Sequence, residues 1–211
     1  MGSDIHGLLQ KRWSPGRAYE TISEIEHGRN YILFAALAGV RNYYNIKPIS
    51  EPRGIPDDIS YDPDKTYDEE GKRLPGALDL GDHSFSWLTL RELLDWDGWD
   101  QTFTLSGYVA RTEYERMMAA GETAPNNWCG GVGGGGTVKT SATEVIAGTA
   151  PSDWNYVYCE WQGVVRDYCE TFMKWLDYLK SAHDWMLYPS PHNPDYVPDT
   201  AALRIVFGFD S

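Results

Sequence analysis

SDIHGLLQKRW, residues 3–13, is followed directly by the turn sequence SPGR (14–17) and by the alternating stretch YETISEI (19–25). A Pro-Gly turn between two such stretches is typical of a β-hairpin. At the opposite end of the chain, ALRIVFGF (202–209) is almost wholly apolar, which indicates a strand buried within a sheet. We therefore expect the N-terminal hairpin and the C-terminal strand to share one mostly antiparallel sheet.

Two helices are expected to pack on this sheet. The stretch NYILFAALAGV (30–40) is apolar on nearly every side, with Asn30 suited to cap its start and Gly39 to end it, so it predicts a central, buried helix. Residues 155–182 place Trp, Tyr and Val at intervals of three, four and seven. This spacing predicts a long C-terminal helix.

Short helices and loops are expected to make up the rest of the chain. The pair Thr89 and Glu92 has the spacing of a capping box, and residues 111–120 show an amphipathic helical pattern. The Pro- and Asp-rich stretch 47–81 and the Gly-rich stretch 129–136 are interpreted as loops. With 211 residues and no internal repeat, the chain is predicted to form a single α+β domain over residues 1–211.

The composition excludes several classes of protein. Hydrophobic residues make up 42% of the chain and aromatic residues 14%, which is enough for a packed core. The formal net charge of −13 argues against binding to a nucleic acid polymer, because the protein would repel the phosphate backbone. No apolar run approaches the roughly 18 residues of a membrane span, and no signal peptide is recognisable, so we expect no membrane partner. Three Cys residues without a C-x-x-C pair indicate neither a disulfide framework nor a thiolate zinc site, and they fit a reducing cytoplasm.

Asp4-Ile5-His6 is the strongest indication of chemistry in the chain. Side chains two residues apart on a strand share a face, so Asp4 and His6 are expected to stand side by side. Such a pair can supply half of a divalent metal site or act as an acid/base pair. Asp82 and His83 are the candidates for the other half, since we expect them at the entrance of a helix. These four residues are therefore predicted to be catalytic, either binding Zn, Mn or Mg or sharing the acid/base role.

Five further residues are predicted to bind an anionic ligand near those four. A helix entrance presents unpaired backbone N–H groups that suit an anion. An Arg can bind a phosphate, and a neighbouring Gly lets the backbone approach the phosphate closely. The predicted ligand-binding residues are Arg41, Asn42, Arg53, Ser84 and Ser86. A structural alternative stays open, in which Asp82 or Ser84 caps a helix, Asp4 accepts backbone hydrogen bonds and the arginines form surface ion pairs.

One local resemblance supports the metal hypothesis. Ser3-Asp4-Ile5-His6-Gly7 resembles the first motif of the calcineurin-like metallophosphoesterases, S-D-x-H-G, in which the Asp and the His bind metal. The second motif of that family, G-D-x-x-D, is matched only at Gly81 and Asp82, because Phe85 stands where the last Asp is expected. The G-N-H-[DE] motif is not matched.

A broader resemblance covers most of the chain. The stretches MGSDIH (1–6), RNY (29–31), LAGVRN (37–42), EPRG (51–54), DHSFSWLT (82–89) and RIVFGFD (204–210) are similar to a family of uncharacterised bacteriophage proteins. The resemblance implies a phage origin and action in the cytoplasm of an infected bacterium. Small phage proteins with a polar pocket often counter host defence by degrading or trapping nucleotide immune signals.

Three functions follow as hypotheses. The first is a metal-assisted hydrolase of a small phosphorylated or nucleotide-like molecule, such as a host immune signal. The second is a non-catalytic protein that sequesters a nucleotide second messenger, with Trp and Tyr as stacking surfaces. The third is an acidic inhibitor that binds a basic host defence protein. For the second we expect a homo-oligomer with exposed Trp96 and Trp99 at its interface.

Overall fold

The computed structural model describes residues 2–25, 27–59, 66, 68–70, 72, 74, 78–193 and 195–210. The fold is α+β, as predicted, and its contacts group the chain into two compact units. Unit 1 consists of Met1–Asp100 and Val165–Ser211, and unit 2 is the intervening segment Gln101–Val164.

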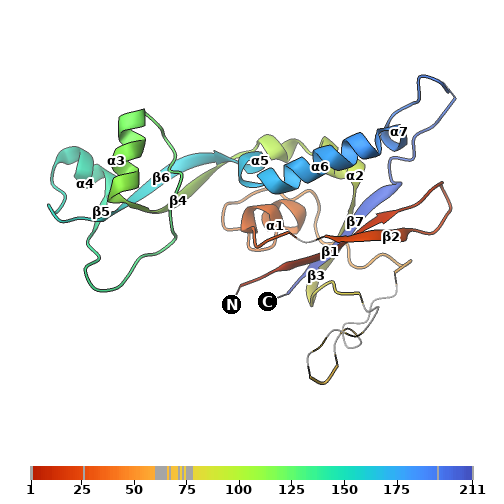
Figure 1. The fold of residues 1–211 in the computed structure, drawn as a ribbon, viewed down its shortest axis with the longest axis horizontal. Coiled ribbons are helices and arrows are strands. Elements are labelled where there is room, and N and C mark those ends of the chain that lie inside the picture. Colours follow the sequence, from red (N-terminus) through yellow and green to blue (C-terminus); the bar gives the residue numbers. More distant parts are fainter. Residues whose placement is uncertain are drawn as a thin grey trace. The chain divides into compact units, whose positions relative to one another are not determined.

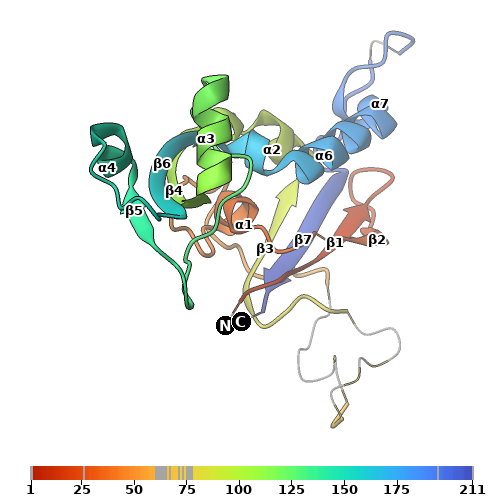
Figure 2. The ribbon, with the colours of Figure 1, turned by 60° about the vertical axis from the view of Figure 1, so that its left-hand side comes forward.

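Unit 1 is built on an antiparallel sheet with the strand order β2-β1-β7-β3 (Figure 1). Its strands are β1 (Ile5–Lys11), β2 (Glu20–Ile25), β3 (His83–Thr89) and β7 (Leu203–Phe209). Every residue of β7 is buried, and β7 pairs along its length with β1. The two ends of the chain therefore lie side by side, as Figures 1 and 2 show. The predicted hairpin and the predicted buried C-terminal strand are confirmed.

Helices α1 (Tyr31–Ala38) and α6 (Glu170–Ala182) cover one side of this sheet, which we call the helix face (Figure 2). The Asn30 side chain accepts hydrogen bonds from two backbone N–H groups in the first turn of α1, and Gly39 ends the helix in the left-handed conformation. Phe34 of α1 is fully buried and packs edge-on against Phe209 of β7, with ring centroids 5.1 Å apart. The predicted central helix is thus confirmed.

Shorter helical segments connect the main elements of unit 1. They are α2 (Leu90–Asp95), the 3-10 helix η2 (Asp97–Asp100), α5 (Val165–Tyr168) and α7 (Asp184–Leu187). Thr89 and Glu92 form the predicted capping box at the start of α2. Trp99 is only 3% exposed, and its Nε1 donates to the Leu93 carbonyl oxygen at 2.7 Å, so the expectation of an exposed Trp99 at an interface is wrong. Its indole packs edge-on against Trp96 instead.

Segments without helix or strand cover the opposite side of the sheet, which we call the loop face. Leu8 and Val206 form a buried cluster there with Leu80. The carbonyl oxygen of Leu80 comes so close to β7 that a Cβ atom at Gly208 would lie 2.2 Å from it, so only glycine fits at this position. The described parts of the predicted loop 47–81 contain no helix or strand, and the rest of that stretch lies outside the described residues.

Unit 2 has a smaller sheet with the strand order β4-β6-β5. β4 (Thr102–Ala110) pairs antiparallel with β6 (Tyr156–Val164), and β5 (Lys139–Ser141) pairs parallel with β6 through the connecting helix α4 (Ala142–Ala147). Helix α3 (Arg111–Ala120) follows β4 and confirms the predicted helix at 111–120. The Gly-rich stretch 129–136 contains no helix or strand, apart from one β-bridge at Cys129.

The prediction of one long helix over residues 155–182 is wrong in its first part, because residues 156–164 form β6 and α6 begins only at Glu170. In β6 the residues Val157, Cys159 and Trp161 are buried and the residues between them are exposed, which is the period of a strand. Aromatic and β-branched residues fit both spacings, and pairing with β4 decides between them. Within the described residues, no helix combines the length and the apolar character required to cross a bilayer.

Candidate functional site

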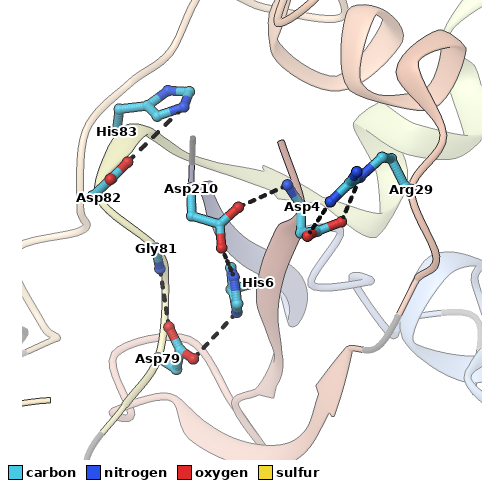
Figure 3. A network of polar contacts seen from close by, with 8 residues as sticks. All are labelled: Asp4, His6, Arg29, Asp79, Gly81, Asp82, His83 and Asp210. Atoms are coloured by element: carbon cyan, nitrogen blue, oxygen red, sulfur yellow. Dashed lines mark hydrogen bonds and ion pairs between the residues drawn. The ribbon is translucent and has the colours of Figure 1, made fainter. Parts of the chain in front are cut away.

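His6 of β1 places its imidazole between two carboxylates on the loop face of the sheet (Figure 3). Its Nδ1 lies 3.2 Å from Asp79 Oδ2, and its Nε2 lies 3.1 Å from Asp210 Oδ2. A neutral imidazole has one N–H and can donate to only one of these carboxylates, whereas a protonated ring can donate to both. The three side chains can therefore share and transfer a proton.

The ends of β1 and β7 position Asp210. Because the two strands are antiparallel, residues 4–6 lie beside residues 208–210. Asp210 Oδ1 accepts a hydrogen bond from the Asp4 N–H at 2.8 Å, and the Asp210 N–H donates to the Asp4 carbonyl oxygen at 3.2 Å. These bonds extend the ladder past the last strand pair and hold Asp210 against His6.

A turn at Gly81 positions Asp79. The Gly81 N–H donates to Asp79 Oδ1 at 3.2 Å, which leaves the other carboxylate oxygen directed at His6. Gly81 has a φ of 75°, and a Cβ atom there would lie 2.4 Å from the backbone carbonyl of Phe209. Both the conformation and the close approach require glycine. The contact between Asp79 and His6 therefore depends on this turn.

The Asp4 carboxylate turns toward Arg29. The two side chains form a bidentate pair, with Nε to Oδ1 at 2.9 Å and Nη2 to Oδ2 at 2.7 Å. The hydrogen bonds from Arg29 hold the pKa of Asp4 below its ordinary value. Both side chains are about half exposed, so the pair adds little to stability. Its consequence is geometric, because it fixes Arg29 at the N-terminal end of β1, next to Gly2.

Asp82 and His83 lie across β7 from His6. β3 begins at His83, so the helix entrance predicted at these residues is wrong. His83 pairs with Phe209 and stacks on its ring with centroids 6.0 Å apart, which puts His83 on the helix face. His6 pairs with Gly208, the preceding residue of β7. Because successive residues of a strand point to opposite faces, the two imidazoles face opposite sides of the sheet.

The predicted set of four residues does not fit a single metal ion. A metal site needs several donor atoms directed at one point, and His6 and His83 face away from each other. The carboxylates that do approach His6 lie on different ring nitrogens, which diverge. Within the ranges that the structure describes, no group of three or more His, Cys, Asp or Glu could hold a metal ion.

Two of the predicted ligand-binding residues have structural contacts near the end of α1. Arg41 Nε donates to the hydroxyl of buried Ser3 at 2.9 Å. The Asn42 side chain accepts from the Ile46 N–H at 2.9 Å and donates to the Ile46 carbonyl oxygen at 2.7 Å, which closes the loop between them. Both side chains are thereby part of the scaffold.

The other three predicted ligand-binding residues lie on or beside β3. Arg53 forms an ion pair with Glu92 at 2.6 Å, and its guanidinium lies over the ring of Trp87. The Arg53 N–H donates to the hydroxyl of buried Ser86 at 3.2 Å. The Ser84 hydroxyl lies 2.9 Å from His83 Nδ1. The structure thus joins Arg53 to Ser86 and Ser84 to His83, and it joins Asp4 to His6 through Asp210.

Two cavities border the region around His6. The smaller, of about 320 Å³, is lined by residues that include Asp4, His6 and Asp79. The larger, of about 500 Å³, is lined by residues 27–30, Leu33 and residues 167–172. His27 lines both cavities, and Arg29 of the larger one binds Asp4 of the smaller one. The two cavities are therefore neighbours in unit 1, with His27 between them.

The larger cavity lies where the first turns of α1 and α6 meet. Asn30 Nδ2 donates to the Tyr168 carbonyl oxygen at 2.7 Å and links the two helix starts. The N-cap of α6 is Cys169, whose side chain makes no capping hydrogen bond, so no side chain caps the first N–H groups of this helix. Burial raises the pKa of the Cys169 thiol to about 12, so the thiol adds no negative charge there.

His27 stands between the two cavities with one nitrogen unused. Its ring packs edge-on against Phe172 and Trp175, with centroids 5.0 and 5.5 Å away. Burial lowers the pKa of His27, which favours the neutral ring. Its Nε2 is buried and finds no hydrogen-bond partner among the described residues. Because an unpaired buried polar atom is unfavourable, this nitrogen marks a place where a ligand group would be stabilised.

Sequence reasoning missed Asp79, Asp210 and His27. Asp210 could have been found, because an N-terminal hairpin strand antiparallel to a C-terminal strand brings residues 4–6 beside residues 208–210. Asp79 and His27 lie outside helices and strands, and no periodic pattern places them. Comparison of the chain with models of protein families, with curated proteins and with solved structures gives no match. The functional inference therefore depends on the geometry of the site.

Proposed function

We propose that this protein binds a small phosphorylated or nucleotide-like molecule in the larger cavity of unit 1 and holds it without cleaving it. The observation that carries the proposal is the cavity of about 500 Å³ at the uncapped start of α6, with Arg29 and His27 in its wall. Its volume lies within the range of roughly 300–1,000 Å³ that is usual for small-molecule sites.

The wall of the cavity offers a partner for each part of such a ligand. The start of α6, which no side chain caps, and the guanidinium of Arg29 suit an anionic group. Tyr168 supplies aromatic surface for a planar ring, and Asp167 can accept hydrogen bonds from hydroxyl or amino groups. The two positive features attract the ligand, and the aromatic and acidic groups select among anions.

Equilibrium binding measurements test this proposal. The probes are cyclic mononucleotides, cyclic dinucleotides and nucleoside diphosphates, each recovered afterwards and analysed for cleavage. Arg29→Gln should weaken the binding of a bound probe by about tenfold or more, because a charge-assisted contact is lost. Arg17→Gln is the matched control, since Arg17 is exposed in the hairpin turn. Absence of binding by every probe, or equal affinity in both variants, would contradict the proposal.

A second candidate function is hydrolysis of the same ligand, with His6 as general acid or base. It is favoured by the Asp79–His6–Asp210 contacts on the smaller cavity, which adjoins the larger one at His27. No metal step enters this mechanism, because the residues predicted to bind a metal do not converge. If wild type returns a cleaved probe and His6→Gln returns an intact one, the protein is a hydrolase and the sequestration proposal is wrong.

The biological setting of the proposal comes from the resemblance to bacteriophage proteins. A phage protein that binds a nucleotide-like molecule in the cytoplasm of an infected bacterium could act against host defence by removing an immune signal. Expression of the wild type and of Arg29→Gln in cells with and without such a signalling system would test this role. Protection by the wild type alone is the expected result.

A further inference from the structure

Lys11, the last residue of β1, is buried without an acidic partner. The residue is 7% exposed, and its ammonium nitrogen lies 3.7 Å from the ring centroid of Trp13 and 5.5 Å from that of Trp185. Glu20, its cross-strand neighbour on β2, is exposed and forms no ion pair with it. In the part of the chain that the structure describes, no other carboxylate forms an ion pair with Lys11 either.

The surroundings of Lys11 combine exposed aromatic surface with an unpaired polar atom. Both rings make cation–π contacts with the ammonium group. Even so, Trp13 is 62% exposed and Trp185 is 49% exposed. His183, at the junction of α6 and α7, has a buried Nδ1 for which the described part of the chain offers no hydrogen-bond partner. Burial and the charge of Lys11 lower the pKa of His183, so this neighbour favours the neutral state. Nothing in this set supplies a negative charge.

The stem of Lys11 is buried, and among the described residues its ammonium group has aromatic faces and no carboxylate as partners. We infer that Lys11, Trp13 and Trp185 form a binding site for a small anion that carries a planar ring, of which a nucleoside monophosphate is the simplest example. The anionic group takes the ammonium group as its partner, and the ring stacks on an exposed indole. The two chain segments that build the site meet only in the folded protein.

This site is distinct from the cavity of the proposed function. Lys11 lies at the far end of β1 from His6, roughly 17 Å along the strand at the usual rise per residue. Its side chain contacts α7, whereas the larger cavity lies at the start of α6. The two sites can therefore be tested by separate variants.

Calorimetric titration of the full chain with a nucleoside monophosphate tests the inference. Inorganic phosphate and the uncharged nucleoside serve as probes for each half of the ligand, and both should bind more weakly than the monophosphate. Lys11→Met keeps the aliphatic stem and removes the charge, so it should weaken monophosphate binding by about tenfold or more. The same variant should melt close to wild type, because the aliphatic stem that packs in the fold is kept. Lys180→Met, an exposed lysine of α6, is the matched control and should change neither property.

Trp185→Leu is the second variant. It should weaken the binding of the monophosphate and leave the binding of inorganic phosphate unchanged, because only the ring loses its partner. In the Arg29→Gln background, which removes a cation of the larger cavity, Lys11→Met should weaken monophosphate binding by the same factor as it does in wild type. The inference is overturned if folded wild type shows no saturable binding of the monophosphate, if Lys11→Met binds it as wild type does, or if Arg29→Gln abolishes the binding.

Discussion

Replacing Gly208 with Ala should destabilise unit 1, because the added methyl group has no room on the loop face. A Cβ atom at this position would lie 2.2 Å from the carbonyl oxygen of Leu80 and 2.6 Å from a ring carbon of Phe85. An unstrained carbon–oxygen contact is about 3.3 Å, so the overlap with Leu80 is about 1 Å. β7 is held by β1 on one side and β3 on the other, and therefore the segment around Leu80 must move away.

The expected loss of stability is about 3 kcal/mol, the upper end of the range for overpacking, because the nearest atom belongs to the backbone and not to a flexible side chain. For a chain of this size, each kcal/mol lowers the melting temperature by about 2–4 °C, so a fall of about 6–12 °C is expected. Thermal unfolding followed by circular dichroism measures it. Because Asp79 precedes Leu80, the same shift should also open the contact between Asp79 and His6.

Gly7→Ala is the matched control, on the neighbouring strand. A Cβ atom at Gly7 would have its nearest neighbours at 3.4 Å, which is ordinary contact. Its stability should stay within about 1 kcal/mol of wild type. A Gly208→Ala protein that melts like wild type, or two alanine variants with equal losses, would show that the segment around Leu80 does not lie against β7.

Two further predictions concern titration and thiol reactivity. The hydrogen bonds from Arg116 hold the pKa of Glu113 at about 2, below its ordinary value near 4.5, so the stability that Glu113 gives unit 2 is present above pH 4.5 and is lost as the pH falls toward 2. The difference in melting temperature between wild type and Glu113→Gln should therefore shrink over that range, and a difference that stays constant with pH would refute this reasoning. Burial raises the pKa values of the Cys159 and Cys169 thiols, the latter to about 12, whereas Cys129 is partly exposed. Titration of the native protein with a disulfide reagent should therefore modify Cys129 alone, and a second fast-reacting thiol would contradict the packing of α6 or β6.

The parts of the fold that could be predicted are those in which local chemistry and burial agree. The hairpin has a Pro-Gly turn between alternating strands, and α1 has both an Asn30 cap and a Gly39 end, so the sequence favours one local structure at each place. β7 is predicted by its continuous apolar run, because a strand buried on both faces has no polar side. In each case pairing with distant elements strengthens a preference that is already local.

The element that could not be predicted is β6, where distant pairing decides the structure. Val157, Trp161 and Val164 fit helical spacing as well as Val157, Cys159 and Trp161 fit a strand. The second set is buried because β4 offers an antiparallel partner and β5 a parallel one. The sequence of residues 155–182 contains no Gly or Pro at the change from strand to helix that would end one element, apart from Gly163 within β6 itself.

In the candidate site, too, contacts between residues close in sequence could be predicted, and contacts that depend on the pairing of distant strands could not. Asp4 and His6 line the same small cavity, because two residues in extended backbone cannot be far apart, but the Asp4 carboxylate contacts Arg29 and the His6 ring contacts other carboxylates. Their partners depended on the strand order, and a single residue of register decides which face each candidate occupies. His83 pairs with Phe209 and His6 with Gly208, so the four-residue metal site fails by one position along β7.

The proposed binding of a small anion depends on local charges more than on the net charge. A net charge of −13 acts over distance and is weakened by salt beyond about 10 Å at 0.1 M ionic strength. Within contact distance the field comes from single groups, and it is less screened where those groups are buried. Lys11 supplies a positive charge at one site. The start of α6 and Arg29 supply positive charge at the other, in the wall of the larger cavity. An acidic surface is therefore expected to repel long polyanions such as nucleic acids, while a small anion can still reach a local positive group. This separation by size is what a protein that collects a nucleotide among cellular nucleic acids would need.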